Sequence, residues 1–360
     1  IITFYKNFNI LYNCLYHLKN SLKEIEPPEI ILINDNPSLK LQKNEEIKKY
    51  FKEILIIDNT ENHGYAEACN IAINNASGDV IVLMDCDIMV KGNWLNNMYQ
   101  SLCSSENIGG VSSIILNMEN NTVLHYGFAT NKIDMIKPYF GRPIKEIIND
   151  IPQDLYRFPT LTSGCCMFRK AVYLQVGGMD KQLYNGYCDL DLFYKMNSAG
   201  YKNILCRTAY VYHRGCVSEE VRTYLKTDTK ALFCSRWGQS FYKEGLAILK
   251  NIFNHAFTKF NDKYLLYNFS RSLFSDDYMS ILSEIANILQ NYTINVQNNS
   301  NVILEDVLSI SVQNSKFAII YFCDDYRQIV KNYFWFSGRK NCGDLIVDRN
   351  GNIIKCNDLI

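Results

Sequence analysis

Short apolar runs alternate with helical patterns up to residue 87, and this alternation restricts the fold more than any other feature of the chain. The apolar runs are IITFY, EIILIN, EILIID and VIVLM. Helical spacing lies between them, at Leu11, Leu15, Leu18 and Leu22, then near residues 38–51, then from about Gly64 to Ala76. Such alternation predicts an α/β fold with a Rossmann-like, mostly parallel sheet flanked by helices.

A less regular middle region follows, broken by Pro138, Pro143, Pro152 and Pro159. The pattern then predicts a helix after Ser163-Gly164, a second helix from about Cys188 to Ala199, and a short strand, ILCRTAYVYH.

The character of the chain changes near residue 219. The segment SDDYMSILSEIANILQ predicts an amphipathic helix behind a Ser275 cap. Further on, DLIVDRNGNIIKC carries an Asn350-Gly351 turn between apolar runs, which predicts a β-hairpin. We expect two domains: residues 1–218, and a mainly helical extension over 219–360 that ends in the hairpin and shows no chemistry of its own.

Composition narrows the functional classes. Lys plus Arg equals Asp plus Glu, at 37 each in 360 residues, which argues against a nucleic-acid partner. The sequence shows no membrane span and no signal core at its start, so we expect a cytoplasmic protein. It begins at Ile1 inside a predicted strand, without a methionine, as a fragment would. The thirteen cysteines are scattered without a CxxC pair, which indicates reduced core thiols.

The run VIVLMDCDIMV predicts a buried strand that ends in two carboxylates, Asp85 and Asp87. Side chains alternate along a strand, so both should point one way and Cys86 the other. Ligands of open α/β sheets bind at the carboxyl ends of the strands, and divalent cations prefer carboxylate oxygens. The alternative is a solvated turn after the strand.

Two further segments predict polar groups near the same edge. In ENHGYAEACN, Gly64 permits a tight turn close to a ligand, and Asn62 and Asn70 offer hydrogen bonds. The alternative is an ordinary helix start with Asn62 as its cap. Asp35, after the second strand, suits either an imide hydrogen bond from a nucleobase or a helix cap.

The helix near residue 188 begins with Asp189 and Asp191, which a helix turns to nearly opposite faces. Asp191 precedes Lys195 by four residues, the favourable order for a surface ion pair, so we assign Asp191 to structure and Asp189 to chemistry. His213, at the end of the last strand, is a candidate third ligand for a transition ion such as manganese.

These signals occur in an order that resembles the inverting family-2 glycosyltransferases with a GT-A fold, of the bacterial polysaccharide and rhamnosyltransferase-like type. The matching segments over residues 1–218 are TFYK, INDNPS, NHGYAEACN, DCD, HYG, TSGCCMFRK, the GG-x-D loop, the helix start at Asp189, and HRGCVS.

The resemblance implies a role for each candidate residue. Tyr5 and Asp35 would contact the nucleobase, while Asn62, Gly64 and Asn70 would line the donor pocket. Asp85 would contact ribose or metal, Asp87 would bind a Mn²⁺ or Mg²⁺ ion on the diphosphate with His213 as a further ligand, and Asp189 would be the general base. His125, Tyr126, Gly127 and the Ser163-Gly164 loop would position donor sugar and acceptor.

The resemblance also implies the reaction and its partners. A nucleotide-sugar donor would give its sugar to a glycan or lipid-linked acceptor in cell-surface polysaccharide synthesis, and the helical tail leaves peripheral membrane association open. Two positions depart from the family pattern: Cys188 stands where a glutamate is common, and Lys6 where asparagine is usual.

Two other interpretations stay open at this stage. A nucleotidyltransferase acting on sugar phosphates would carry a glycine-rich, basic loop after the first strand, where this chain has YKNFNI. A non-catalytic sugar- or partner-binding module would keep the fold without turnover, and Cys188 is its one hint.

Overall fold

The computed structural model describes residues 1–23, 26, 28–130, 135–149, 151–152, 155–214, 226–238, 241–257, 264–268, 318–330 and 343–359. The chain forms two compact units, one of Ile1–Ala129 with Tyr156–Gln239 and one of Thr130–Leu155 with Ser240–Ile360. The amphipathic helix predicted behind Ser275 lies outside the described residues. The domain boundary at residue 218 stays a prediction.

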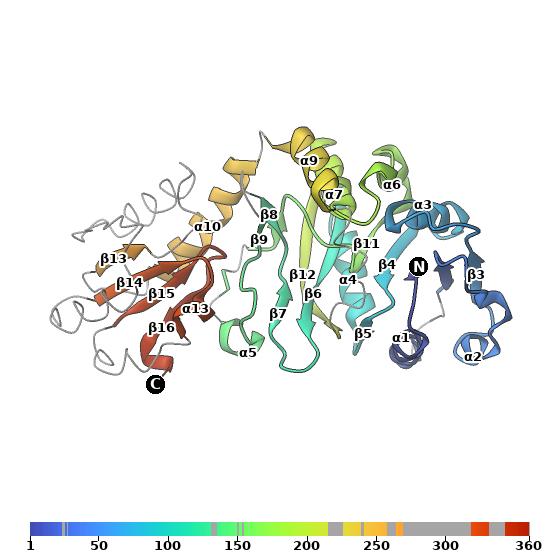
Figure 1. The fold of residues 1–360 in the computed structure, drawn as a ribbon, viewed down its shortest axis with the longest axis horizontal. Coiled ribbons are helices and arrows are strands. Elements are labelled where there is room, and N and C mark those ends of the chain that lie inside the picture. Colours follow the sequence, from blue (N-terminus) through green and yellow to red (C-terminus); the bar gives the residue numbers. More distant parts are fainter. Residues whose placement is uncertain are drawn as a thin grey trace. The chain divides into compact units, whose positions relative to one another are not determined.

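The first unit is built on a ten-stranded mixed sheet, drawn in Figure 1. Its order is β10-β12-β6-β11-β4-β1-β2-β3, with β5 beside β12 and β7 beside β6. The strands are β1 (Ile2–Phe4), β2 (Ile31–Asn34), β3 (Leu55–Asp58), β4 (Val80–Asp85), β5 (Ile88–Val90), β6 (Ile108–Asn117), β7 (Val123–His125), β10 (Arg157–Phe158), β11 (Cys165–Arg169) and β12 (Lys202–His213). The strands β4, β1, β2 and β3 are parallel, as the alternating pattern predicts.

Helices cover both faces of this sheet, which confirms the predicted α/β class (Figure 1). Helices α1 (Phe8–Ser21) and α4 (Trp94–Cys103) lie on one face. The other carries α3 (Tyr65–Asn75), α6 (Lys170–Gln175) and α7 (Cys188–Ser198). Shorter or peripheral elements are η1 (Leu41–Lys43), α2 (Glu45–Lys48), η2 (Lys181–Leu183) and α9 (Lys226–Trp237). The single helix predicted near residues 38–51 is thus two short turns.

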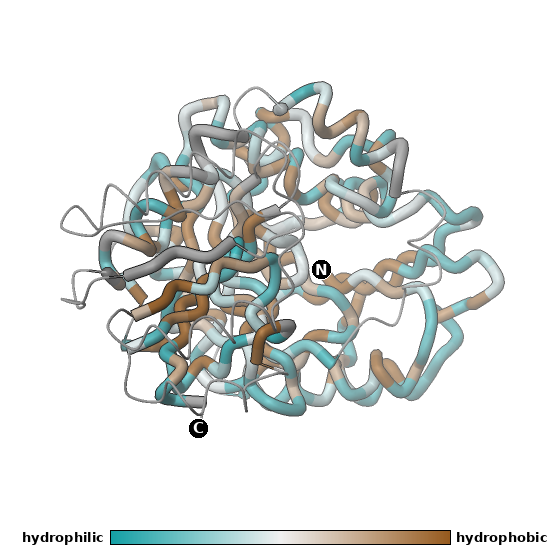
Figure 2. The backbone as a smooth tube through the Cα atoms, turned by 60° about the vertical axis from the view of Figure 1, so that its left-hand side comes forward, coloured by the Kyte–Doolittle hydropathy of each residue, from teal (hydrophilic) through white to brown (hydrophobic). Residues whose placement is uncertain are grey.

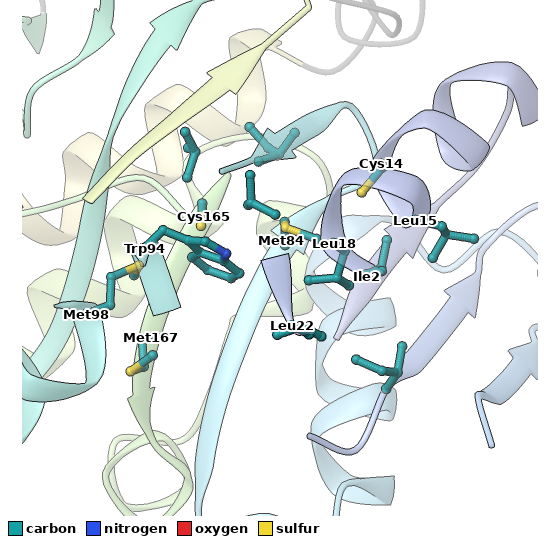
Figure 3. Close-up of a cluster of buried hydrophobic side chains, with 14 of the residues drawn as sticks. Ile2, Cys14, Leu15, Leu18, Leu22, Met84, Trp94, Met98, Cys165 and Met167 are labelled. Carbon is teal, nitrogen blue, oxygen red and sulfur yellow. The ribbon is translucent and has the colours of Figure 1, made fainter. Parts of the chain in front are cut away.

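One apolar core joins α1 and α4 to the sheet. Leu18 of α1 lies near Met84 of β4 and Ile2 of β1, while Trp94 and Met98 of α4 lie near Met167 of β11 (Figure 3). The helices alternate hydrophobic and hydrophilic residues along their length, as expected for elements with one buried face (Figure 2). Several cysteines are core residues, among them Cys14, Cys69, Cys165 and Cys166.

A further sequence prediction for the first unit is wrong, and a predicted strand begins earlier than expected. The segment after Ser163-Gly164 first forms the strand β11, and the helix α6 begins only at Lys170. A short, wholly apolar run such as CCMFR suits a buried strand and a helix equally well. The strand ILCRTAYVYH is also longer than predicted, because β12 spans twelve residues.

The second unit contains a four-stranded sheet of order β13-β14-β15-β16. Its strands are β13 (Tyr264–Asn268), β14 (Ala318–Cys323), β15 (Leu345–Asp348) and β16 (Ile353–Lys355), and its helices are α5 (Ile144–Ile147), α10 (Phe241–Phe257), α13 (Tyr326–Val330) and η4 (Cys356–Leu359). β15 and β16 form an antiparallel hairpin around Asn350-Gly351, as predicted. The parallel strands β13 and β14 were not predicted.

The segment 135–149 belongs to this second unit although it interrupts the sequence of the first. The Tyr326 hydroxyl donates a hydrogen bond to the Gly141 carbonyl at 3.0 Å, and the Lys137 N–H donates to Asn350 Oδ1 at 3.1 Å. The segment begins with β9 (Met135–Ile136), which pairs with β8 (Ala129–Thr130) in a two-stranded ribbon. Across the described residues, no helix combines the length and the apolar character needed to cross a membrane.

Candidate functional site

The carboxyl ends of three parallel strands carry three of the predicted site residues. Tyr5 follows β1, Asp35 follows β2, and Asp85 ends β4. The register pairs Phe4 with Asn34 and Thr3 with Asp85, so these strand ends lie side by side. Parallel strands deliver their carboxyl ends to one edge, which is where α/β sheets bind ligands.

Asp35 is buried, with 7% of its surface exposed, and it organises the loop before α3. Its Oδ1 accepts hydrogen bonds from the His63 N–H at 2.9 Å and from Asn59 Nδ2 at 2.8 Å, and its Oδ2 accepts from the Gly64 N–H at 2.8 Å. The carboxylate thus holds the entrance of α3, in the manner of a cap supplied by another strand. The proposed contact with a nucleobase would use the remaining lone pairs.

Glycine is required at position 64 by the backbone conformation there and by a neighbouring side chain. Its φ is +80°, and a Cβ there would lie 2.4 Å from Cδ2 of Tyr184. The Tyr184 hydroxyl donates to Asn62 Oδ1 at 2.8 Å, and the same Oδ1 accepts the Gly64 N–H at 3.1 Å. The close approach expected at Gly64 is therefore made by a tyrosine of this chain. Sequence reasoning missed Tyr184, although the turn signal Asn185-Gly186 beside it marks that loop.

Asn70 of α3 forms a separate network of hydrogen bonds. Its Nδ2 donates to the Met179 carbonyl at 2.9 Å, and its Oδ1 accepts from the Met179 N–H at 3.2 Å and from the Tyr173 hydroxyl. These contacts fix the Gly177-Gly178 loop to α3. Its predicted role as a lining residue of a donor pocket stays a prediction.

Asp85 and Asp87 have different partners. β4 ends at Asp85, and Asp87 lies in the turn before β5. The sequence predicted that strand alternation would include Asp87, but the strand stops before it. Cys86 packs against the core on the α1 face. The Asp85 N–H donates to the Gly164 carbonyl at 3.0 Å, and Asp85 Oδ1 accepts from Thr3 Oγ1 at 3.4 Å.

Asp87 is paired with His213. The register of β5 and β12 sets His213 opposite Ile88, and its Nε2 lies 3.0 Å from Asp87 Oδ2. Both side chains are largely buried, with 13% of Asp87 and 19% of His213 exposed. The other oxygen, Asp87 Oδ1, is buried without a hydrogen-bond partner among the described residues. A buried carboxylate oxygen of this kind is costly unless a partner satisfies it.

Asp189 begins α7 as predicted and lies at the Ser163-Gly164 loop. Its Oδ2 accepts the Ser163 N–H at 3.2 Å, and its Oδ1 accepts the Leu190 N–H at 2.9 Å. Because Gly164 also binds the Asp85 N–H, two adjacent loop residues hold both aspartates. The Tyr65 hydroxyl donates to Ser163 Oγ at 2.8 Å. Burial, helped by the charge of Asp85, raises the pKa of Tyr65, so its hydroxyl keeps its proton as a donor.

Asp191 points away from this loop, as the helical spacing predicts. It forms the expected ion pair with Lys195, at 2.7 Å, but it is fully buried rather than on the surface. It also accepts hydrogen bonds from Arg236 at 3.2 Å and Trp237 at 3.0 Å, which tie α9 to α7. Its role is structural.

A divalent cation fits the Asp87–His213 pair on chemical grounds. Carboxylate and imidazole are both ligands of manganese-like ions, and Asp87 Oδ1 has no hydrogen-bond partner within the part of the chain that the structure describes. Within the described ranges, no group of three or more His, Cys, Asp or Glu side chains could hold a metal by itself. A cation here would therefore take further ligands from water or from a bound diphosphate.

Comparison with known families agrees with this arrangement. Residues 1–177 match the model of glycosyl transferase family 2, a family of the glycosyltransferase class of enzymes. The chain carries a domain of glycosyl transferase family 2.

Two curated relatives belong to the same class. A probable N-acetylgalactosaminyltransferase 9 from Caenorhabditis elegans is 25% identical over 164 residues, which cover 43% of this chain and 28% of that protein. An uncharacterized glycosyltransferase from Haemophilus influenzae is 33% identical over 110 residues, which cover 29% of this chain and 34% of the relative. The chain thus spans about a third of the length of these relatives or less.

Two solved structures are similar at low identity. A mannosyltransferase from Pyrobaculum calidifontis, solved with GDP-Man and Mn²⁺, has a TM-score of 0.46 and 12% identity, covering 94% of this chain and 84% of that one. TarS from S. aureus has a TM-score of 0.46 and 14% identity, covering 80% of this chain and 48% of that one.

Proposed function

We propose that the amino-terminal domain transfers a sugar from a nucleotide-diphosphate sugar to a hydroxyl group of a glycan or lipid-linked acceptor, with inversion, in cell-surface polysaccharide synthesis. The observation that carries this proposal is the Ser163-Gly164 loop. It holds Asp189, the proposed base, beside Asp85, the proposed ribose or cation contact. Acid–base and donor-binding groups must lie this close for one displacement to join them.

Asp189 supports the proton transfer. An acceptor hydroxyl loses its proton as it attacks the anomeric carbon, and a carboxylate positioned to take that proton contributes roughly 10²–10⁴ in rate. Two N–H donors, of Ser163 and Leu190, fix its orientation. The attack and the departure of the nucleotide occur on opposite sides of the sugar, so a single step inverts the anomeric centre.

Asp87 and His213 would hold the divalent cation, Mn²⁺ or Mg²⁺. When bound, the ion supplies Lewis-acid stabilisation to the charge that grows on the departing diphosphate. The register of β5 and β12 already brings Asp87 and His213 together, and Asp87 Oδ1 is available to bind a further ligand.

The donor nucleoside would lie near Tyr5, Asp35, Asn62 and Gly64, with Asn70 supporting the wall behind them. Asp85 would face either the ribose or the cation. A cytoplasmic location, with peripheral contact at the inner face of a membrane, stays a prediction of the sequence.

A donor screen tests the proposal. The purified protein is mixed with a panel of nucleotide sugars, with manganese, magnesium or a chelator, and nucleotide release is measured. We expect release from one donor class that depends on the cation. Binding of nucleotide sugars without release from any of them, in the presence of candidate acceptors, would contradict the proposed activity and favour a binding module.

A further inference from the structure

The loop 184–187, between η2 and α7, is anchored on the start of α3. The Tyr184 carbonyl accepts the Ala66 N–H at 3.0 Å, and Asn185 Oδ1 accepts the Tyr65 N–H at 2.7 Å. The first N–H groups of a helix have no partner inside the helix, so these bonds satisfy two of them. The backbone of Tyr184 is therefore positioned independently of its side chain.

The side chain of Tyr184 lies over the groups predicted to bind a nucleobase. Its ring covers Gly64, whose N–H binds Asp35 Oδ2 at 2.8 Å. Its hydroxyl donates to Asn62 Oδ1 at 2.8 Å, and Asn62 Nδ2 lies 3.5 Å from the hydroxyl of Tyr5. Asn62 thus lies between two tyrosines that come from distant parts of the chain, next to the Asp35 carboxylate.

The backbone at Tyr184 is unfavourable for a bulky residue. Its φ is +44°, in the range that glycine and asparagine occupy most easily. A glycine would make the same carbonyl contact to Ala66 at lower conformational cost. What the tyrosine adds at this position is its aromatic ring.

The surroundings of Tyr5 and Tyr184 are suited to reversible binding of a ligand. The hydrogen bonds that join Asn62 to the two tyrosine hydroxyls are exposed to solvent, and Tyr5 is 36% exposed. Burial, with the charges of Asp35 and Tyr5 adding to it, raises the pKa of Tyr184, so the phenol stays neutral. A neutral ring beside a carboxylate offers a face for stacking together with an acceptor for an imide N–H.

We propose that Tyr184 is a specificity-determining residue that stacks on the nucleobase of the donor and forms, with Tyr5, the aromatic part of the base site. The inference rests on the proposed function in so far as a nucleotide sugar is the donor. The ligand class is a nucleoside diphosphate, recognised through its base.

Two substitutions at this position test the role of the ring. Tyr184→Ala removes the ring and keeps the carbonyl contact to Ala66, while Tyr184→Trp keeps an aromatic face and adds a fluorophore. Binding of UDP, GDP, ADP and dTDP to the full chain is measured with Mn²⁺, and the tightest ligand is used thereafter. Tyr184→Ala should weaken its binding about tenfold, the effect of losing one stacked base contact.

The tryptophan variant gives a readout that a structural role would not change. Its added fluorescence should be quenched when the nucleoside diphosphate binds. The control is Tyr16→Trp, at an exposed tyrosine of α1 that has no part in the proposed site. Thermal unfolding of each variant reports whether the fold is kept.

Three results would overturn the inference: binding by Tyr184→Ala within twofold of the unchanged chain, quenching in Tyr184→Trp no larger than in Tyr16→Trp, or no binding of any of the four nucleotides by the unchanged chain. A different result would contradict the proposed function. A chain that binds a nucleotide through Tyr184 but releases none from any nucleotide sugar would contradict sugar transfer and leave the base contact intact.

Discussion

Two aspartates far apart in the sequence are both hydrogen-bonded to one loop, Asp85 through its backbone N–H and Asp189 through its carboxylate, and a third, Asp87, pairs with His213. This division separates the proposed tasks. The loop binds the residues proposed for proton transfer and for ribose or cation contact, while the Asp87–His213 pair is proposed to hold the cation on the diphosphate. Because each proposed role depends on one or two side-chain atoms, single substitutions can test it.

Replacing Asp87 with Ala should remove cation-dependent nucleotide binding. The reason is the loss of both carboxylate oxygens, one of which pairs with His213 while the other has no hydrogen-bond partner among the described residues. Titration of the tightest nucleoside diphosphate, with Mn²⁺ and with a chelator, measures the effect. We expect the cation to increase affinity at least about tenfold in the unchanged chain and less than about twofold in the variant.

Glu119→Gln is the matched control, since Glu119 lies exposed in the turn between β6 and β7 and its substitution also removes one negative charge. It should retain the full effect of the cation. Equal stimulation by Mn²⁺ in Asp87→Ala and in the unchanged chain would refute the metal role of Asp87.

Some site residues could be predicted from the sequence because their positions follow from local geometry. Asp189 and Asp191 separate because a helix turns about 100° per residue, and the structure has them facing Ser163 and α9. Tyr184 could not be found this way. Its contacts with Asn62 and Gly64 join segments that no local spacing relates.

At the scale of elements, two strands that the sequence did not predict, β6 and β11, share one physical cause. β6 and β11 are buried on both faces, so they show no alternation of polar and apolar residues. In β6, Gly109-Gly110 and Ser112-Ser113 further weaken the strand pattern. The glycines have a reason that only the packing shows, because a Cβ on Gly110 would lie 2.4 Å from Cε1 of Phe193 in α7.

Replacing Gly110 with Ala should therefore destabilise the first unit by about 1–3 kcal/mol, the usual cost of adding a methyl group to a filled core. Urea unfolding measures the change. Gly78→Ala is the control, since a Cβ there would make only an ordinary contact, 3.6 Å from the Val80 carbonyl. We expect its effect to stay within about 0.5 kcal/mol.

The double variant Gly110→Ala, Phe193→Leu identifies the source of the strain. A smaller side chain at position 193 makes room for the new methyl group, so the two substitutions should cost less together than the sum of their separate costs. Strict additivity would show that the clash with Phe193 is not what makes glycine necessary.

At the scale of the whole molecule, the order of residues along the chain does not match its compact units. The segment 130–155 leaves the first unit after Ala129 and belongs to the second, where residues 137–142 bond to the hairpin and to α13. The prolines in this segment predicted irregular structure, but no local pattern could indicate that it packs with residues some two hundred positions later. Parallel pairing of β13 and β14 is non-local in the same way.

The second unit should lose stability between about pH 4 and pH 6. Burial raises the pKa of Asp348 to about 6, whereas an unfolded aspartate titrates near ~4. In this range the folded state binds more protons than the unfolded state, so the free energy of unfolding falls as the pH rises, by about 3 kcal/mol in total. Above about pH 6 this contribution of Asp348 to the free energy of unfolding is fully lost.

Urea unfolding at pH 4, 5, 6 and 7, compared between the unchanged chain and Asp348→Asn, checks this dependence. The amide does not titrate, so this part of the slope should vanish in the variant, whatever its absolute stability. An identical slope in both proteins would show that Asp348 does not carry the pH dependence.

The central claim is that Asp189 removes a proton from the acceptor, and replacing Asp189 with Asn tests it most directly. The amide can still accept the Ser163 N–H but is a far weaker base. With the donor found by the screen and its acceptor, we predict that nucleotide release falls at least about a hundredfold while donor affinity stays within about twofold. Turnover within a few fold of the unchanged chain would contradict the account.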